Sequence, residues 1–380
     1  MTERSERGGS HRDDRGGRGY RGGSGGGDRG YRGGSGGGRG GGGRGGDRGY
    51  RGGDRGYRDG ERGRSRRVYD DEPRDGLLAD LVGHLHALDG RSYAAYKAIV
   101  GRYRAPAGWF LHIDRVQADP YAPPTRIHVD VPTDLHGLEL LDEADLLADA
   151  DRRLAVGDFL TRELHAGFRG TALSIASPGQ EILQRSSIIV RPDEKKEGPG
   201  WVLEIRARLA LPAQGRSIQG HEASRIVGRD LVRELEEAMD LTGERGDRLV
   251  RHIATLEDHR ALTATVARNG WVSFLADGSV LPRRSGVSDE PLDGGVPLEA
   301  PDSMAATVEL PHAGTVRGTV VEAGVNVIVG GGYHGKSTLL SAIERGVYPH
   351  VPGDGRELVA TVPDAVKVRA ADGRAVTGVD

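Results

Sequence analysis

The residues best suited to chemistry lie near the end of the chain, where a glycine-rich loop runs into a lysine and a serine. The pattern G-x-x-x-x-G-K-[ST] is satisfied at Gly330, Gly335, Lys336 and Ser337. Glycines at this spacing let consecutive backbone N–H groups face an anion at the start of a helix. The lysine adds a positive charge for phosphate, and the serine hydroxyl binds the Mg²⁺ that bridges nucleotide phosphates. The loop therefore predicts binding of ATP with Mg²⁺.

The predicted nucleotide-binding residues form one continuous segment: Gly330, Gly331, Gly332, Tyr333, His334, Gly335, Lys336, Ser337 and Thr338. Lys336 is expected to reach the β- and γ-phosphates, and Ser337 is the predicted metal ligand. A glycine-rich turn with only a structural role would leave the Lys-Ser pair at the helix start unexplained.

Two elements must position this loop. Residues 325–329 are a short apolar run that predicts a buried strand before the loop. Residues 339–346 predict a helix after it, ending at Gly346. Strand, glycine-rich turn and helix together are the context that a phosphate-binding loop requires.

An α+β region, without a recognisable catalytic pattern, is predicted upstream. Helices are expected at 77–90, 92–100, 223–241 and 246–264, and strands at 109–116, 127–131, 182–190 and 201–211. Asp114, Asp119 and Asp130 could form an acid cluster, but scattered surface acids are the favoured interpretation. The adjacent Arg283 and Arg284 could hold a phosphate, but a solvated loop is the favoured interpretation.

The first 67 residues have a different composition. They repeat Arg-Gly-Tyr-Arg-Gly-Gly and contain eighteen arginines and nine acids, a formal charge of +9, whereas the whole chain sums to −3. With almost no aliphatic side chains, residues 1–74 are expected to form a disordered Arg-Gly-Tyr-rich tail. Arginine pairs with phosphate and tyrosine stacks on bases, so this Arg-Gly-Gly (RGG) repeat predicts contact with RNA or single-stranded nucleic acid. A flexible solubilising tail is the alternative.

Composition also excludes several classes of protein. The chain has no cysteine, which removes disulfide frameworks, thiolate zinc sites and cysteine nucleophiles. No apolar run is long enough for a membrane span, and the N-terminus has no secretory signal. A cytoplasmic location is therefore expected.

The loop and its surroundings resemble the predicted ATPases of the ABC class. The run GGGYHGKSTLL at 330–340 is similar to that family's phosphate-binding loop. Further similar segments are GRSY at 90–93, HID at 112–114, PGQE at 178–181, LPRRSG at 281–286, GVY at 346–348, PGDGRE at 352–357 and AVK at 365–367. The resemblance runs from about residue 77 to residue 380 and does not include the tail.

The resemblance implies a domain organisation and a partner. It implies a family-specific α+β N-terminal domain at 75–241, then the first part of an ABC-type α/β nucleotide-binding domain at 242–380. It also implies a homodimer and a link to nucleic acid. Tyr333 and His334 stand where most ABC proteins have Asn or Ser with small residues, and no aromatic residue lies between Phe274 and Tyr333 to stack on adenine. Adenine recognition is therefore expected to differ.

Hydrolysis is expected to be impaired in this chain. An ABC ATPase also needs a second carboxylate-bearing motif and a signature segment, and only Asp364 follows an apolar run after Ser337. The catalytic residues are therefore unknown and expected in sequence beyond residue 380. The main hypothesis is an ATP-binding ABC-class ATPase that acts with RNA. The alternatives are a non-catalytic RNA-binding protein with a vestigial loop and a transporter-associated ATPase.

Overall fold

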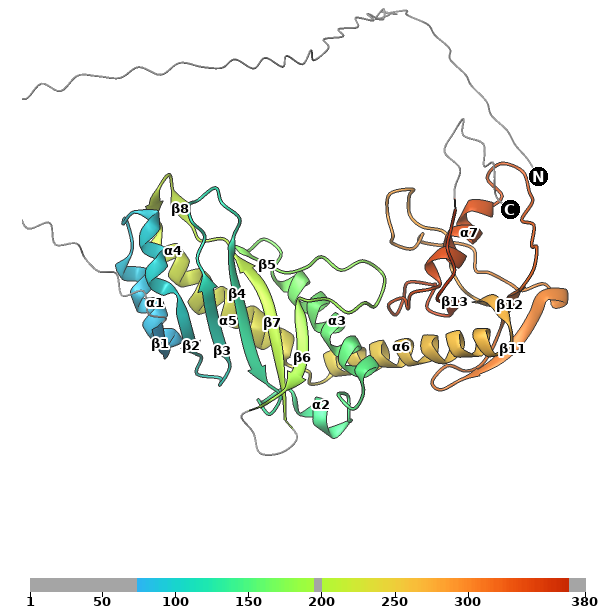
Figure 1. Cartoon of the computed structure of the whole chain (residues 1–380), viewed down its shortest axis with the longest axis horizontal. Helices are drawn as coiled ribbons and strands as arrows, with labels where there is room; N and C mark the ends of the chain where they lie inside the picture. The colour runs from blue at the N-terminus through green and yellow to red at the C-terminus, as the bar shows by residue number, and fades with distance from the viewer. Residues whose placement is uncertain (1–73, 195–199, 369–380) are drawn as a thin grey trace, which may run out of the picture. The chain divides into compact units, whose positions relative to one another are not determined.

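The computed structural model describes residues 74–194 and 200–368 (Figure 1). The predicted tail lies outside the described residues, apart from Arg74. Within the described part of the chain, no helix combines the length and the apolar character needed to cross a bilayer.

A seven-stranded sheet is the framework of the N-terminal part. Its strand order is β1-β2-β3-β4-β7-β5, with β6 also paired to β7, and only the β1–β2 pairing is parallel. The strands are β1 (Arg74–Leu77), β2 (Gly101–Arg104), β3 (Phe110–Arg115), β4 (Thr125–Pro132), β5 (Leu173–Ser174), β6 (Ile188–Pro192) and β7 (Trp201–Leu209). The predicted strands at 109–116, 127–131 and 201–211 are confirmed, whereas the one expected at 182–190 begins only at Ile188.

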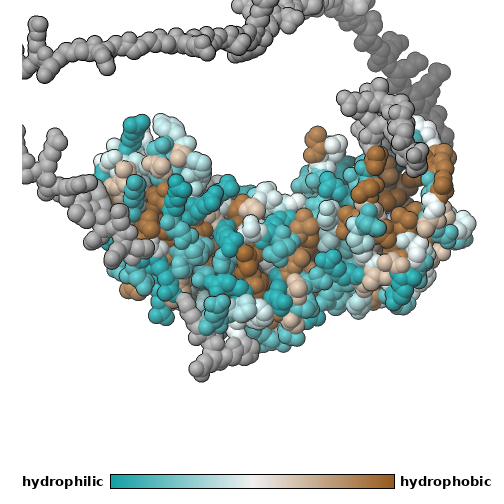
Figure 2. Space-filling model, viewed as in Figure 1, coloured by the Kyte–Doolittle hydropathy of each residue, from teal (hydrophilic) through white to brown (hydrophobic). Residues whose placement is uncertain are grey.

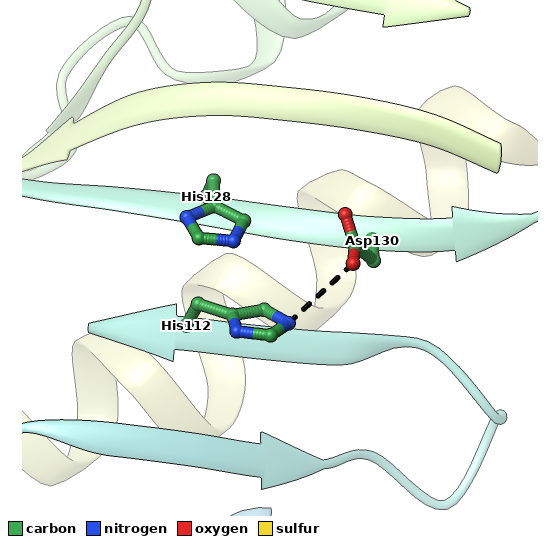
Figure 3. A group of neighbouring side chains, drawn as sticks. All are labelled: His112, His128 and Asp130. Carbon is green, nitrogen blue, oxygen red and sulfur yellow. Dashed lines mark ion pairs between the residues drawn. The ribbon is translucent and has the colours of Figure 1, made fainter. Parts of the chain in front are cut away.

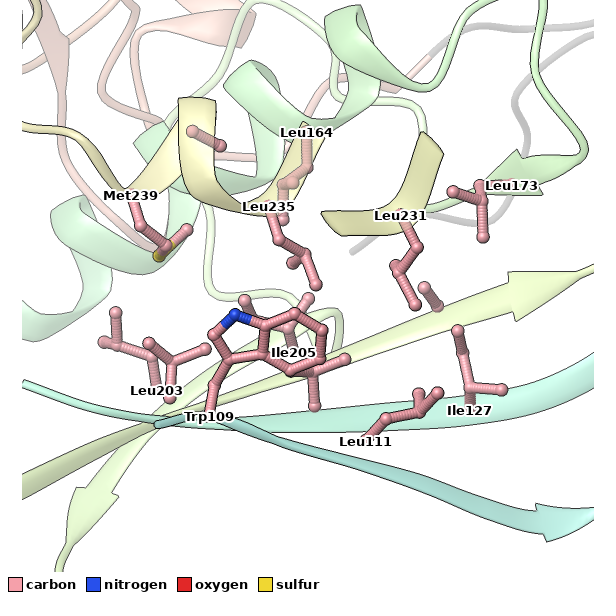
Figure 4. Packing of buried hydrophobic residues seen from close by; sticks show 14 of the residues in the cluster. Trp109, Leu111, Ile127, Leu164, Leu173, Leu203, Ile205, Leu231, Leu235 and Met239 are labelled. Carbon is pink, nitrogen blue, oxygen red and sulfur yellow. The ribbon is translucent and has the colours of Figure 1, made fainter. Parts of the chain in front are cut away.

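Helices pack on one face of this sheet. They are α1 (Leu78–Ala87), α2 (Glu139–Glu143), α3 (Ala150–Gly167), α4 (Gly220–Arg225) and α5 (Leu231–Met239). Leu231 and Leu235 of α5 lie over Leu111, Ile127 and Ile205 of the sheet, and all five side chains are buried (Figure 4). Alternate strand residues supply this core because successive side chains point to opposite faces.

The opposite face of the sheet is polar. His112 of β3 is the register partner of His128 of β4, and Arg206 of β7 is the partner of His128 on the other side. Figure 2 shows that hydrophilic residues predominate over this part of the molecule.

Most helix predictions are confirmed. The predicted helix at 77–90 is α1, and the one at 92–100 is a 3₁₀-helix, η1 (Tyr93–Ile99). The helix at 223–241 corresponds to α4, a π-helical turn η2 (Ile226–Asp230) and α5. Helix α3 was not predicted. A small hairpin of β8 (Ala213–Gln214) and β9 (Ser217–Ile218) precedes α4.

The 25-residue helix α6 (Glu244–Arg268) contributes to two separate cores. Leu249, Ile253 and Leu256 belong to the core of the N-terminal sheet. Leu262 and Val266 belong to a second core, together with the sheet that follows. The helix therefore links the two parts of the chain through its own backbone.

The second sheet has four antiparallel strands in the order β11-β12-β10-β13. They are β10 (Trp271–Ala276), β11 (Ala305–Leu310), β12 (Gly314–Glu322) and β13 (Val359–Thr361), with a 3₁₀ turn η3 (Asp302–Met304) before β11. Helix α7 (Lys336–Arg345) follows the glycine-rich loop, as predicted. The expected fold class, α+β followed by mixed α/β, is confirmed.

The strand predicted at residues 325–329 is wrong. This segment is irregular, and Val325 and Val329 are 97% and 81% exposed. The segment does not join the four-stranded sheet, in which β10 lies between β12 and β13. No strand among the described residues pairs with 325–329, so its backbone has no ladder to join.

Candidate nucleotide-binding site

Helix α7 begins directly after the glycine-rich loop. Its N-cap residue, Gly335, has a φ of +78° in the left-handed region, which glycine adopts without a Cβ clash. Lys336 is the first helical residue, and Ser337 and Thr338 follow in the same turn. The free backbone N–H groups of such a turn favour an anion.

The loop before α7 makes contacts of its own. The backbone N–H of Gly331 donates to Nδ1 of His334 at 3.2 Å. Nζ of Lys336 donates to the carbonyl oxygen of Gly330 at 2.6 Å and also to that of Gly331. Tyr333 has a φ of +62° and a fully exposed side chain. The lysine ammonium therefore lies against carbonyl oxygens of its own loop, the loop at which the sequence predicts phosphate binding.

A cavity of about 400 Å³ lies beside α7. Helix α7 contributes its hydroxyl-bearing residues and Arg345, and the loop after β10 contributes Arg283. Two residues of the N-terminal part also border it. The main polar residues of its wall are Gln180, Glu181, Arg283, Ser337, Thr338, Ser341, Arg345 and Arg356.

Arg283 is held by a buried carboxylate. Its Nη2 lies 2.8 Å from Oδ2 of Asp354, and Nη1 donates to Oδ1 of Asp354 at 3.0 Å. Nδ1 of His350 lies 2.8 Å from Oδ2 of the same carboxylate. Burial alone would raise the pKa of Asp354, but His350 and Arg283 outweigh it and hold this pKa below its ordinary value. The expectation of a solvated loop is therefore wrong for Arg283 and holds for Arg284, which is exposed.

A segment of the N-terminal part reaches this site. Ile182 donates its backbone N–H to Pro349 at 2.8 Å, and Val351 donates to Gln180 at 2.9 Å. Nη1 of Arg345, in the last turn of α7, donates to Oε1 of Glu181 at 3.0 Å. The helix that starts at the phosphate-binding loop is thus tied at its other end to the N-terminal part.

A buried charge network supports that segment. Asp158 of α3 accepts a hydrogen bond from Nε of Arg162 at 2.7 Å and also contacts Arg185 and Nε2 of His252. The two arginines donate in turn to the backbone carbonyl oxygen of Glu181. Burial lowers the pKa of His252 to about 3 and that of Arg162 to about 10. Because His252 is neutral, the single negative charge of Asp158 is shared by the two guanidinium groups of Arg162 and Arg185.

The structure brings together only part of the predicted set. Ser337 and Thr338 border the cavity, whereas residues 330–335 form the exposed turn that leads into α7 and Lys336 is partly buried at the helix start. Sequence reasoning missed Glu181, Asp354 and the role of Arg345, because their partners are distant in the chain. The available signals were the arginine pair at 283–284 and the family-similar segments 178–181 and 352–357, which contain Glu181 and Asp354.

Helix α7 and the glycine-rich turn before it supply two of the three elements expected of a P-loop protein, and the strand expected at 325–329 is not formed. Comparison with known families is more specific. Residues 245–380 match the P-loop domain of the ABC ATPases, and residues 78–241 match the N-terminal domain of the ATPases of the ABC class. The chain belongs to the ATPases of the ABC class. A comparison with curated proteins found no match.

Proposed function

We propose that this chain binds ATP through residues 330–338, with Ser337 as a ligand of Mg²⁺. The observation that carries this is the start of α7, where a left-handed Gly335 leads directly into Lys336, Ser337 and Thr338 beside a cavity that contains Arg283. The donors fit the ligand, because helix N–H groups, an ammonium and hydroxyls suit phosphate and a hard cation. The bound metal would neutralise phosphate charge.

Lysine replacement tests this proposal. Lys336→Ala should weaken ATP affinity at least about tenfold, because a charge-assisted hydrogen bond contributes about 1.5–3 kcal/mol. Lys97→Ala removes the same charge from an exposed site on η1 and is the matched control. Nucleotide affinity is measured by equilibrium titration of the full chain. Equal affinities for the wild type and Lys336→Ala would disprove the proposed site.

Hydrolysis by this chain alone is proposed to be slow. Phosphoryl transfer needs a group that positions the attacking water. Of two acids at the cavity wall, Glu181 is paired with Arg345, and Asp289 lies in an exposed loop. The catalytic residues therefore stay unassigned. We expect the chain to bind ATP while its steady-state hydrolysis stays slow. Rapid hydrolysis by the purified chain, with no other protein present, would contradict this proposal.

Contact with RNA is proposed for residues 1–67, on the basis of their charge and repeats. Binding through phosphate contacts should weaken steeply as salt is raised, and deletion of 1–67 should abolish it. If the chain is an ATPase acting with RNA, nucleotide and Lys336→Ala should both change RNA affinity. No change with either would favour the alternative, an RNA-binding protein with a vestigial loop.

A homodimer is proposed from the family resemblance. Light scattering of the purified full chain, with and without ATP, measures the oligomeric state. A monomer under both conditions would reject the dimer for this chain.

A further inference from the structure

The polar face of the N-terminal sheet carries a cluster of two histidines and one aspartate. His112 lies on β3, and His128 and Asp130 lie on β4 two residues apart, so that all three side chains share one face. Figure 3 shows His112 and His128 side by side, with Asp130 beside the end of the His112 ring. One ligand atom from each lies within 4.8 Å of the other two. This cluster is separate from the proposed nucleotide site.

The distances suit a shared ion better than a hydrogen bond. Nε2 of His112 lies 3.5 Å from Oδ2 of Asp130. This nitrogen is buried and has no hydrogen-bond partner in the described part of the chain. Ligand bonds of about 2.0–2.2 Å at a tetrahedral zinc ion place nitrogen and oxygen ligands about 3.4 Å apart. The gap between these atoms therefore matches one edge of such a site.

The remaining atoms of two ligands are already held. Nδ1 of His128 lies 3.0 Å from Oδ2 of Asp114, which leaves Nε2 of His128 free of that contact. Oδ1 of Asp130 accepts from Nη2 of Arg191 at 2.9 Å, and Arg191 is also anchored by Glu204. A carboxylate behind a ligating histidine fixes its tautomer and strengthens it as a ligand. Asp114 is an exposed surface acid, as expected, whereas Asp130 is largely buried and paired with His112 and Arg191.

The geometry points to a binding site for a divalent transition metal of the zinc type, with His112, His128 and Asp130 as ligands and Asp114 orienting His128. Two imidazoles and a carboxylate form a ligand set that zinc accepts, and one coordination position stays open for water or another ligand.

Binding requires a small rearrangement. The two imidazole rings are stacked, with centroids 4.2 Å apart and planes 11° apart, so their in-plane lone pairs do not converge. One ring must turn about its Cβ–Cγ bond, a torsion with a broad energy minimum. Open space is available, because His128 and Asp114 border a cavity of about 570 Å³ and His112 borders another.

Zinc binding by the full chain tests the site directly. Competition with a chelating indicator should show one Zn²⁺ per chain at this site. His112→Gln, His128→Gln and Asp130→Asn should each weaken the affinity at least about 100-fold, and Asp114→Asn about 10- to 100-fold.

His136→Gln is the matched control, because its side chain is 95% exposed and pairs locally with Glu139. The pair His86 and His221, whose Nδ1 atoms lie 2.7 Å apart, is replaced by Gln to identify any second histidine site.

A second measurement removes dependence on how the variants fold. X-ray absorption of the zinc-loaded wild type should count two imidazoles in the first coordination shell. The proposal is overturned if the wild type binds no zinc in competition with the indicator, if zinc has fewer or more than two imidazoles, or if only the His86/His221 variant loses it. In that case the cluster is a ladder of ion pairs across the sheet.

Discussion

Apolar residues are buried in the N-terminal sheet but exposed in the segment that precedes the glycine-rich loop. In the sheet, Leu111 and Val129 are completely buried between strands and helices. In the phosphate-binding region, Val325, Val327 and Val329 are mostly exposed although their sequence is as apolar. Figure 2 shows a corresponding gathering of hydrophobic surface around α7. An apolar run forms a strand only where neighbouring strands complete its hydrogen bonds.

The largest effect is expected from the buried charge network that lies between these regions. Asp158→Asn should lower the free energy of unfolding by about 3–5 kcal/mol, because two partly buried guanidinium groups lose the fully buried carboxylate that pairs with them. Asp151→Asn, in the exposed pair with Arg260, should cost no more than about 1 kcal/mol. Urea unfolding of both variants measures the difference. Equal effects would mean that the network does not stabilise the contact between the two parts.

A direct comparison of the two apolar groups comes next. Leu111→Ala should lower the free energy of unfolding by about 2–5 kcal/mol, because it leaves a cavity in a closed core. Val327→Ala should change it by less than about 0.5 kcal/mol, because the Val327 side chain is 76% exposed. Urea unfolding again measures both values. A large loss for Val327→Ala would show that residues 325–329 are packed in solution.

Acid should weaken the link between α6 and α7 through His259. Burial lowers the pKa of His259 to about 4 from 6.5, and its Nε2 contacts the carbonyl oxygen of Gly346 at 3.2 Å. The unfolded chain binds the proton first, so this contribution is complete above pH 6.5 and is lost as the pH falls towards 4. Its slope is at most about 1.4 kcal/mol per pH unit.

The variant His259→Gln isolates this contribution. The difference in unfolding free energy between wild type and variant should shrink between pH 6.5 and pH 4, since other titrating groups are common to both. A difference that stays constant over this range would contradict the assignment to His259. Thermal or urea unfolding at several pH values provides the measurement.

The smallest expected effect concerns the ion pair that ties α7 to the N-terminal part. A double-mutant cycle with Glu181→Gln and Arg345→Gln should give a coupling energy of about 0.2–1 kcal/mol, because Arg345 is 44% exposed. ATP affinity of the same variants shows whether the contact influences the proposed site. A coupling energy of zero would leave the backbone bonds at 180–182 as the connection.

Local patterns explain which elements were predicted. Helix α7 follows from a loop and a helix that are contiguous in sequence, and β3 and β4 follow from strict alternation. Helix α3 was missed because its buried positions include Gly157, Asp158 and Thr161, which interrupt an apolar period. The strand at 325–329 was predicted wrongly because its apolar character is local while its pairing is not.

The candidate sites divide in the same way. Residues 330–338 could be predicted from the sequence because they are contiguous and the predicted site relies on their own backbone N–H groups. Arg283 and Asp354 are 71 residues apart and come into contact only in the folded chain. The same holds for His112 and His128, since alternation places each on a face but only the strand register sets them side by side.

The sequence by itself determined the phosphate-binding loop, the helix that follows it and the alternation of the central strands, because backbone conformation and side-chain periodicity act over a few residues. Tertiary structure alone decided that 325–329 stay exposed, that Asp158 supports the segment reaching α7, and that two histidines and an aspartate converge on the sheet. Each of these depends on strand pairing or on burial of charge between distant segments, and neither leaves a local signal.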